Sequence, residues 1–174
     1  MPLLCISVLV LLLLPPSLSC DSKRPAEKIQ EDYMRIVEVD LNNTRDSITT
    51  LLRNVPCPVL KDKPPSCTSE NVTLASTLYT LTCKMKNLGL LHTERLTMSI
   101  LNSLHCRCLE RPTKEPKVKL KKRTATGQRG TEERKSRKET RKLCRAQAMI
   151  SNMTECYLIL NSLLAAMRSN SSTE

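Results

Sequence analysis

Hydrophobic side chains recur every three or four residues in four segments of the chain, the spacing that gathers them on one side of an α-helix. The first helix is expected over residues 29–55, and Pro56 and Pro58 end it because proline cannot continue a helix. A second helix is expected over about 70–88, where Gly89 is a helix-ending signal. Two helices joined by a proline-rich connection are therefore expected in this half of the chain.

A third helix is expected to begin after Thr93, which can cap it, and to end near Cys108. Residues 111–131 have no apolar period and are predicted to form a long solvated connection. The last helix is expected to start near Thr131, and its apolar residues alternate steps of three and four. This seam consists of Leu143, Ala146, Ile150, Met153, Tyr157, Leu160, Leu164 and Met167.

Four helical segments indicate an all-α four-helix bundle, with one domain over residues 20–168 and a polar tail over 169–174. The short link at 89–92 forces the second and third helices to be antiparallel neighbours. The connection at 111–131 is long enough to cross over the bundle. The pattern alone leaves the topology open between up-down-up-down and up-up-down-down.

Residues 1–19 are typical of a secretory signal peptide. They carry no charged side chain, an unbroken apolar run over 9–14, and a small-x-small site at 17–19. The run is too short for a membrane-spanning helix, so we expect a secreted, extracellular, monomeric protein that does not insert into membranes. The start lacks the basic side chains that usually open a signal peptide, which leaves a retained anchor as the alternative.

Cysteine usage indicates disulfides, because cleavage after residue 19 would remove Cys5 and leave an even number. Eight cysteines allow 105 pairings, so their count does not fix the connectivity. A zinc site is disfavoured by the presence of only two histidines and the lack of paired CxxC motifs, and we expect no metal or cofactor. The eight are Cys20, Cys57, Cys67, Cys83, Cys106, Cys108, Cys144 and Cys156.

The net charge is concentrated in residues 107–145, which hold 16 Lys/Arg and 5 Asp/Glu and so account for the whole +11. Such a stretch suits extracellular polyanions such as heparan sulfate. It can also be a solvated run that only aids solubility. Nucleic acid is disfavoured because no aromatic residues are interleaved for base stacking. The candidate polyanion-binding residues are Lys119, Lys121, Lys122, Arg123, Lys135, Arg137, Lys138 and Arg141.

Catalytic motifs are missing from the sequence: it has no GxSxG, P-loop, HExxH or glycine-rich dinucleotide turn. We therefore expect that the chain is not an enzyme.

Four sequons are candidate glycosylation sites, at Asn42, Asn71, Asn152 and Asn170. Asn42 points away from the apolar stripe of the first helix, which suits a glycan.

Several stretches carry a family likeness. They are VDLNNTRDSI at 39–48, KLC at 142–144, TECY at 154–157 with a twelve-residue step between their cysteines, and Cys20 at the start of the mature chain. In their order and spacing, the whole chain resembles the interleukin-7/interleukin-9 family of short-chain four-helix cytokines, as a divergent member. The resemblance implies an up-up-down-down bundle.

The resemblance also implies disulfides. They are Cys20–Cys156, Cys57–Cys144, and Cys67 with either Cys106 or Cys108, which leaves Cys83 for the remaining one of these two. This fourth bridge departs from the family pattern.

A cytokine of this family binds a receptor alpha chain through its first and third helices. It then recruits the common gamma chain through its first and fourth, which activates JAK-STAT signalling for lymphocyte development and survival. The resemblance thus implies receptor contacts at Asp40, Asn43 and Ser47, at Arg95 on the third helix, and at Tyr157 on the last. For Tyr157 the apolar period indicates a core position instead, so two interpretations compete.

Two other functions remain open: another four-helix cytokine of the common-gamma group, or a cationic host-defence or lipid-binding helical protein. A lipid-binding helix would place its basic residues opposite apolar ones. In this chain the densest basic block precedes the apolar seam, which favours a cytokine.

Overall fold

The computed structural model describes residues 24–60, 62–67, 71–109 and 128–171, and every element in these residues is helical. The expected signal peptide and most of the expected basic connection lie outside the described residues. The elements are α2 (Ala26–Asp32), η1 (Tyr33–Val37), α3 (Glu38–Leu51), α4 (Asn71–Lys86), η2 (Leu91–Thr93), α5 (Glu94–Ser103) and α6 (Gln128–Ser171).

The first three elements form one continuous helical rod with a π-helical turn, η1, in its middle. A π turn takes an extra residue, so it rotates the side chains that follow it relative to an ideal α-helix. The rod begins at Ala26 and its last helical residue is Leu51, a few residues before the expected end. Ile36, Leu51 and Val55 belong to the apolar pattern but are exposed at the surface.

The third helix is shorter than expected. It ends at Ser103, so Cys106 and Cys108 both follow its end. Thr93 does not cap it with its side chain; its hydroxyl donates to the carbonyl of Leu90 at 2.8 Å. Gly89 adopts a positive φ of 61°, a conformation that a glycine takes without strain and that ends α4.

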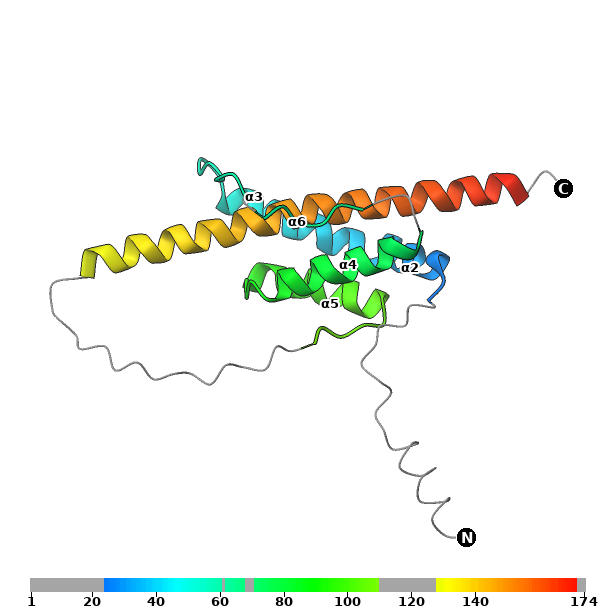
Figure 1. Cartoon of the computed structure of the whole chain (residues 1–174), viewed down its shortest axis with the longest axis horizontal. Helices are drawn as coiled ribbons and strands as arrows, with labels where there is room; N and C mark the ends of the chain where they lie inside the picture. The colour runs from blue at the N-terminus through cyan, green and yellow to red at the C-terminus, as the bar shows by residue number, and fades with distance from the viewer. Residues whose placement is uncertain (1–23, 61, 68–70, 110–127, 172–174) are drawn as a thin grey trace, which may run out of the picture.

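Contacts between side chains fix the directions of the helices. The rod runs antiparallel to α6, because Gln30 contacts Asn161 and Arg45 contacts Thr154 further along the rod. It also runs antiparallel to α5, because Arg24 reaches Asn102 whereas residue 40 contacts residue 99. Since a short link joins α4 to α5, α4 runs the same way as the rod, as Figure 1 shows.

The apolar seam of α6 forms the centre of the core, as its period predicts. Seven of its eight residues are buried, and only Met167, near the end of the helix, is exposed. The ring of Tyr157 is fully buried and stacks on that of Tyr33, with the ring centroids 4.2 Å apart. Each large apolar side chain buried in this way contributes about 1.5–3 kcal/mol to stability.

Three disulfides join described cysteines. Cys57–Cys144 is a bridge that the family resemblance implies, and Cys83–Cys108 is one of its two alternatives for Cys83. The third, Cys67–Cys156, contradicts the implied partners of both its cysteines, Cys106 or Cys108 for Cys67 and Cys20 for Cys156. Cys106 is also disulfide-bonded, but not to another described cysteine, since the other six pair among themselves.

The course of the proline-rich connection explains the corrected bridge. Cys57 ties its beginning to α6, and the side-chain amide of Asn152 then donates to the carbonyls of Pro64 and Pro65, at 3.2 and 2.8 Å. The connection therefore follows α6 along its length (Figure 1), and Cys67 arrives beside Cys156.

The last helix is much longer than the other helices. Its 44 residues span about 66 Å, and among residues 134–171 the first buried one is Leu143. The residues before Leu143 form a basic extension that projects beyond the other helices at the left of Figure 1. At the other end α6 continues to Ser171, so part of the expected polar tail is helical. No helix in the described ranges combines the length and the apolar character that crossing a membrane requires.

Candidate functional site

A charged network joins α3 to α5 at the surface. The Nε of Arg95 lies 3.0 Å from Oδ1 of Asp40, and the hydroxyl of Ser99 donates to Oδ2 of the same carboxylate at 2.7 Å. The aspartate side chain is 6% exposed, whereas the arginine side chain is 88% exposed. The buried carboxylate thus fixes the arginine at Nε and leaves its terminal nitrogens facing outward.

Polar and apolar side chains surround this network. Ile36, Asn43 and Ser47 lie four residues before, three after and seven after Asp40, so helical spacing places them on the same side of the rod. Val39 lies one turn before Asn43. We call the group of Ile36, Val39, Asp40, Asn43, Ser47, Arg95, Met98 and Ser99 the first face.

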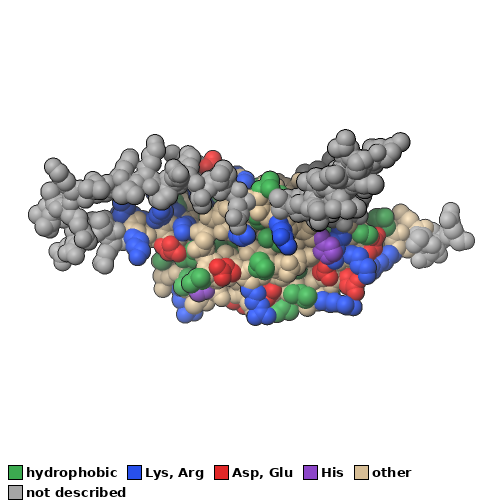
Figure 2. All heavy atoms as spheres, turned by 90° about the horizontal axis from the view of Figure 1, so that it is seen from below, with side chains coloured by type: hydrophobic (Ala, Val, Ile, Leu, Met, Phe, Trp, Pro, Cys, Tyr) green, Lys and Arg blue, Asp and Glu red, His purple; other side chains and the backbone are tan. Residues whose placement is uncertain are grey.

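The first face combines one fixed cation with apolar contact area. Ile36, Val39 and Met98 are each 56% exposed, so none of them belongs to the core. Figure 2 shows the molecule from below the view of Figure 1, the side on which α5 lies, and hydrophobic, basic and acidic side chains are interspersed there. A protein interface of this composition would gain from apolar burial and from one charged anchor.

Four of the five predicted receptor contacts come together on this face. Asn43 and Arg95 are exposed, and Ser47 is half-buried, with its hydroxyl donating to the carbonyl of Asn43 at 2.8 Å. Asp40 does not fit the expectation of direct contact, because it is 5% exposed. Its place beneath Arg95 makes it a positioning residue instead.

Tyr157 is not a surface residue, which contradicts the expected contact with a receptor. Its side chain is fully buried against Tyr33, and burial strongly raises the pKa of its phenol. Its hydroxyl has no hydrogen-bond partner among the described residues. The core position that the apolar period indicated is therefore the correct interpretation.

A second face lies where the rod packs on α6. Leu158, which is 59% exposed, lies four residues after Thr154 and three before Asn161, the two residues that hydrogen-bond to the rod. Met34, also 59% exposed, lies on the rod one turn after Gln30, which hydrogen-bonds to Asn161 of α6. We call Met34 and Leu158, with the polar pairs between them, the second face.

Sequence reasoning missed both apolar residues of the second face. The signal for Leu158 was its position one residue off the core seam, since a leucine there has no place in the core. For Met34 there was no such signal, because the π turn that contains it cannot be identified from the pattern.

The four sequons differ in their surroundings. Asn42 is exposed, with its side-chain carbonyl accepting a hydrogen bond from Arg45, and Asn170 is also exposed. The side chain of Asn71 lies outside the described residues. Asn152 uses its amide nitrogen, the atom that would carry a glycan, to hold the carbonyls of Pro64 and Pro65, so the folded chain disfavours a glycan there.

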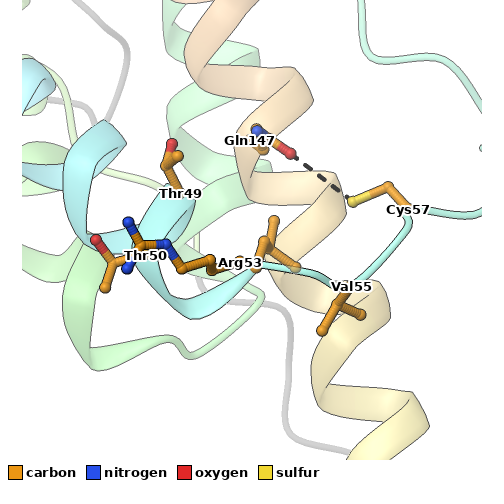
Figure 3. A pocket seen from close by; sticks show the side chains of 7 residues that line it. Thr49, Thr50, Arg53, Val55, Cys57 and Gln147 are labelled. Carbon is orange, nitrogen blue, oxygen red and sulfur yellow. Dashed lines mark hydrogen bonds between the residues drawn. The ribbon is translucent and has the colours of Figure 1, made fainter.

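A hollow of about 460 Å³ at the end of α3 lacks the groups of a reactive site (Figure 3). Sγ of Cys57 lies 3.7 Å from Oε1 of Gln147, but this cysteine is in a disulfide and has no proton to donate. The other lining side chains, among them Thr49, Thr50 and Arg53, include no histidine or carboxylate. Nowhere in the described ranges do three or more His, Cys, Asp or Glu side chains form a group that could hold a metal.

Half of the candidate polyanion-binding residues can be placed. Lys135, Arg137, Lys138 and Arg141 are exposed on the basic extension of α6. The others, Lys119, Lys121, Lys122 and Arg123, lie outside the described residues.

Comparison with known proteins gives no relatives: no family model, no curated protein and no solved structure matches this chain.

Proposed function

We propose that this chain is a secreted helical cytokine of the interleukin-7/interleukin-9 type. In this proposal it joins an interleukin-7-type receptor alpha chain to the common gamma chain, and the two receptors then activate JAK-STAT signalling for lymphocyte development and survival. The chain performs no chemistry itself, but holds two receptor-binding surfaces at a fixed angle. It acts as a monomer.

The fold supports this proposal. The rod and α4 run in one direction and α5 and α6 run in the other, and in the proposal these directions are those of an up-up-down-down short-chain cytokine bundle. Disulfides tie the bundle together, which suits a small protein outside the cell.

The single observation that carries the proposal is the first face. Arg95 is exposed but held by a buried carboxylate, so it loses little side-chain freedom when a partner binds. Exposed apolar side chains surround it, and arginine anchors set in such surroundings are frequent hot spots in protein interfaces. In the proposal this face binds the alpha chain, because it lies on the first and third long helices.

The second face supplies the other contact. It lies on the opposite flank of the rod, between the rod and α6, and includes the exposed Leu158 next to the buried Tyr157. In the proposal Leu158 and Met34 replace Tyr157 as contacts with the common gamma chain. Two receptors could then bind one rod from two sides.

The proposal is tested by binding of the refolded chain 20–174 to the alpha-chain ectodomain of its own species, followed by addition of the common gamma ectodomain. We expect saturable alpha binding and then gamma recruitment. Arg95→Ala should weaken the first step, and Leu158→Asp should weaken only the second. Lys86→Ala, an exposed change on α4, is the matched control. No binding by a chain that is helical and fully oxidised would refute the proposal.

The two alternatives predict different results. Another cytokine of the common-gamma group would recruit the gamma chain with a different first receptor, which a panel of receptor ectodomains identifies. A host-defence or lipid-binding protein would release dye from anionic liposomes. The exposed basic extension of α6 has no apolar side to insert into a membrane over residues 134–142, so we expect no leakage.

A further inference from the structure

The proline-rich connection is held against α6 at several points, so a groove beside it has a fixed shape. Disulfides tie its two ends to α6, and Asn152 holds Pro64 and Pro65 between them. A groove of about 660 Å³ lies between this connection, the end of α4 and α6.

Three cations from three different segments line the groove: Lys63 on the connection, Lys84 on α4 and Arg145 on α6. All three are exposed, and none forms an ion pair with a carboxylate among the described residues, although Asp62 also lines the groove. Cations gathered in this way repel one another and attract an anion. The apolar part of the lining is Leu60, Pro64, Leu88 and Met149.

A stripe of basic residues on α6 leads directly into this groove. Arg134, Lys138 and Arg141 precede Arg145 by eleven, seven and four residues, so all four lie within about 60° of one another around the helix axis. All four are exposed, and the stripe is about 16 Å long. The described acidic residue of this segment, Glu139, points at least about 100° away from each of them.

We propose that the stripe and the groove together form one binding track for a linear sulfated polysaccharide of the glycosaminoglycan class. The track consists of Arg134, Lys138, Arg141, Arg145, Lys63 and Lys84. It is long and narrow, which fits a chain with regularly spaced sulfates better than a membrane surface. This assigns polysaccharide binding to residues that the charge of the sequence alone did not single out, namely Lys63, Lys84 and Arg145.

The track goes beyond the proposed receptor function and does not depend on it. Its α6 residues lie about 100–160° around the helix from Leu158, and none of its residues belongs to either face. A bound polysaccharide would therefore retain the protein near the cell surface while both faces stay free.

The test compares two triple variants with equal loss of charge. Lys63→Gln/Lys84→Gln/Arg145→Gln removes the cations of the groove. Lys28→Gln/Arg53→Gln/Lys86→Gln is the control, and its third change lies on α4 about 200° around the helix from Lys84. Binding of a heparin dodecasaccharide to the full chain is measured at physiological salt, with circular dichroism to show that each variant is folded.

We expect the groove variant to bind about tenfold more weakly than the unchanged chain, since three exposed ionic contacts are lost. The control should change the affinity much less, and Arg134→Gln/Lys138→Gln/Arg141→Gln should resemble the groove variant. An equal loss of heparin affinity in the groove and control variants would show that only the net charge matters, and would overturn the proposal. So would unchanged affinity for desulfated heparin, or tighter binding to phosphatidylserine vesicles than to heparin. Receptor binding by the groove variant should be normal, which separates this proposal from the function proposed above.

Discussion

Asp40 and Arg95 form an ion pair in which one partner is buried and the other is at the surface. The 3.0 Å contact joins α3 to α5, and Ser99 satisfies the second carboxylate oxygen. Burying a carboxylate is unfavourable unless it is paired and hydrogen-bonded, and both conditions are met here. The arrangement therefore stabilises the packing of the two helices and also fixes the exposed guanidinium.

The pair predicts that Asp40 acts on partner binding through Arg95. Arg95→Ala should weaken binding to the alpha-chain ectodomain by about 2 kcal/mol or more, as hot-spot truncations do. Asp40→Asn keeps the size of the side chain but removes the charge that holds the guanidinium, so it should cost less, about 0.5–1.5 kcal/mol. The double variant should bind no more weakly than Arg95→Ala alone, as a double-mutant cycle by titration calorimetry would show. Additive losses would mean that Asp40 contacts the partner independently.

The same pair affects stability. Arg95→Ala leaves the buried carboxylate with Ser99 as its remaining partner among the described residues, so the free energy of unfolding should fall by about 1–3 kcal/mol. Met98→Ala, at an exposed neighbouring position, should change it by less than about 0.5 kcal/mol. Urea unfolding followed by circular dichroism measures both values. Equal effects of the two substitutions would contradict the role given to the ion pair.

Tyr157 provides a prediction about the core. Its ring fills the space against Tyr33, but its hydroxyl lacks a partner among the described residues. Tyr157→Phe should therefore leave stability unchanged or raise it slightly, because it removes an unsatisfied buried polar group. Tyr157→Ala should lower stability by about 3–5 kcal/mol through the cavity it leaves. Thermal unfolding of both variants checks this, and a large loss in Tyr157→Phe would reveal a hydrogen bond that the prediction does not contain.

The same residue predicts how stability depends on alkaline pH. Burial raises the pKa of Tyr157, so the folded chain keeps the phenolic proton at pH values where the unfolded chain loses it. Stability is therefore fully present below the pKa of an unfolded tyrosine, about 10, and falls as the pH rises above it. Urea midpoints measured between pH 8 and 11 should show this decline, and Tyr157→Phe should reduce it. An equally steep decline in the variant would assign the effect to other groups.

Asn152 predicts an empty glycosylation site. Its amide nitrogen donates to Pro64 and Pro65, so a glycan on that atom would displace the connection from α6. Mass spectrometry of glycopeptides from the protein secreted by animal cells should find Asn152 unmodified, whereas the exposed Asn42 and Asn170 are open to modification. High occupancy at Asn152 in folded protein would contradict the described position of the connection. Asn152→Ala should lower stability by about 1–2 kcal/mol, since two hydrogen bonds are lost.

The sequence predicted the features that repeat along the chain and missed those that depend on a single turn. The α6 seam was predicted because seven buried residues share one helical period, and that period placed Tyr157 correctly when the family resemblance did not. The family resemblance singled out Asp40, Asn43 and Ser47, which helical spacing places on one side of the rod. The burial of Asp40 was not predicted, because it depends on Arg95 and Ser99 of another helix.

The partner of Cys67 could not be predicted for a similar reason. Which cysteine Cys67 meets depends on the path of the proline-rich connection, and that path is fixed by contacts with Asn152 far along the chain. The π turn at Tyr33–Val37 also leaves no clear trace in the apolar pattern, yet it rotates the residues that follow it. Local periodicity therefore predicts the helices, whereas contacts between segments determine the site.

The bridge Cys67–Cys156 gives the last prediction. Together with Cys57–Cys144 it holds the connection against α6, so removing it should loosen one end of the connection and leave the other tied. Cys67→Ala/Cys156→Ala should lower the free energy of unfolding by about 2–5 kcal/mol, as removal of a native disulfide from a small domain does. Hydrogen exchange should rise at residues 62–67 more than at the first face. Before the variant is made, non-reducing peptide mapping of the unchanged protein should recover a peptide in which Cys67 is linked to Cys156. Recovery of Cys20 linked to Cys156 instead would restore the pairing that the family resemblance implies, and would contradict the described path of the connection along α6.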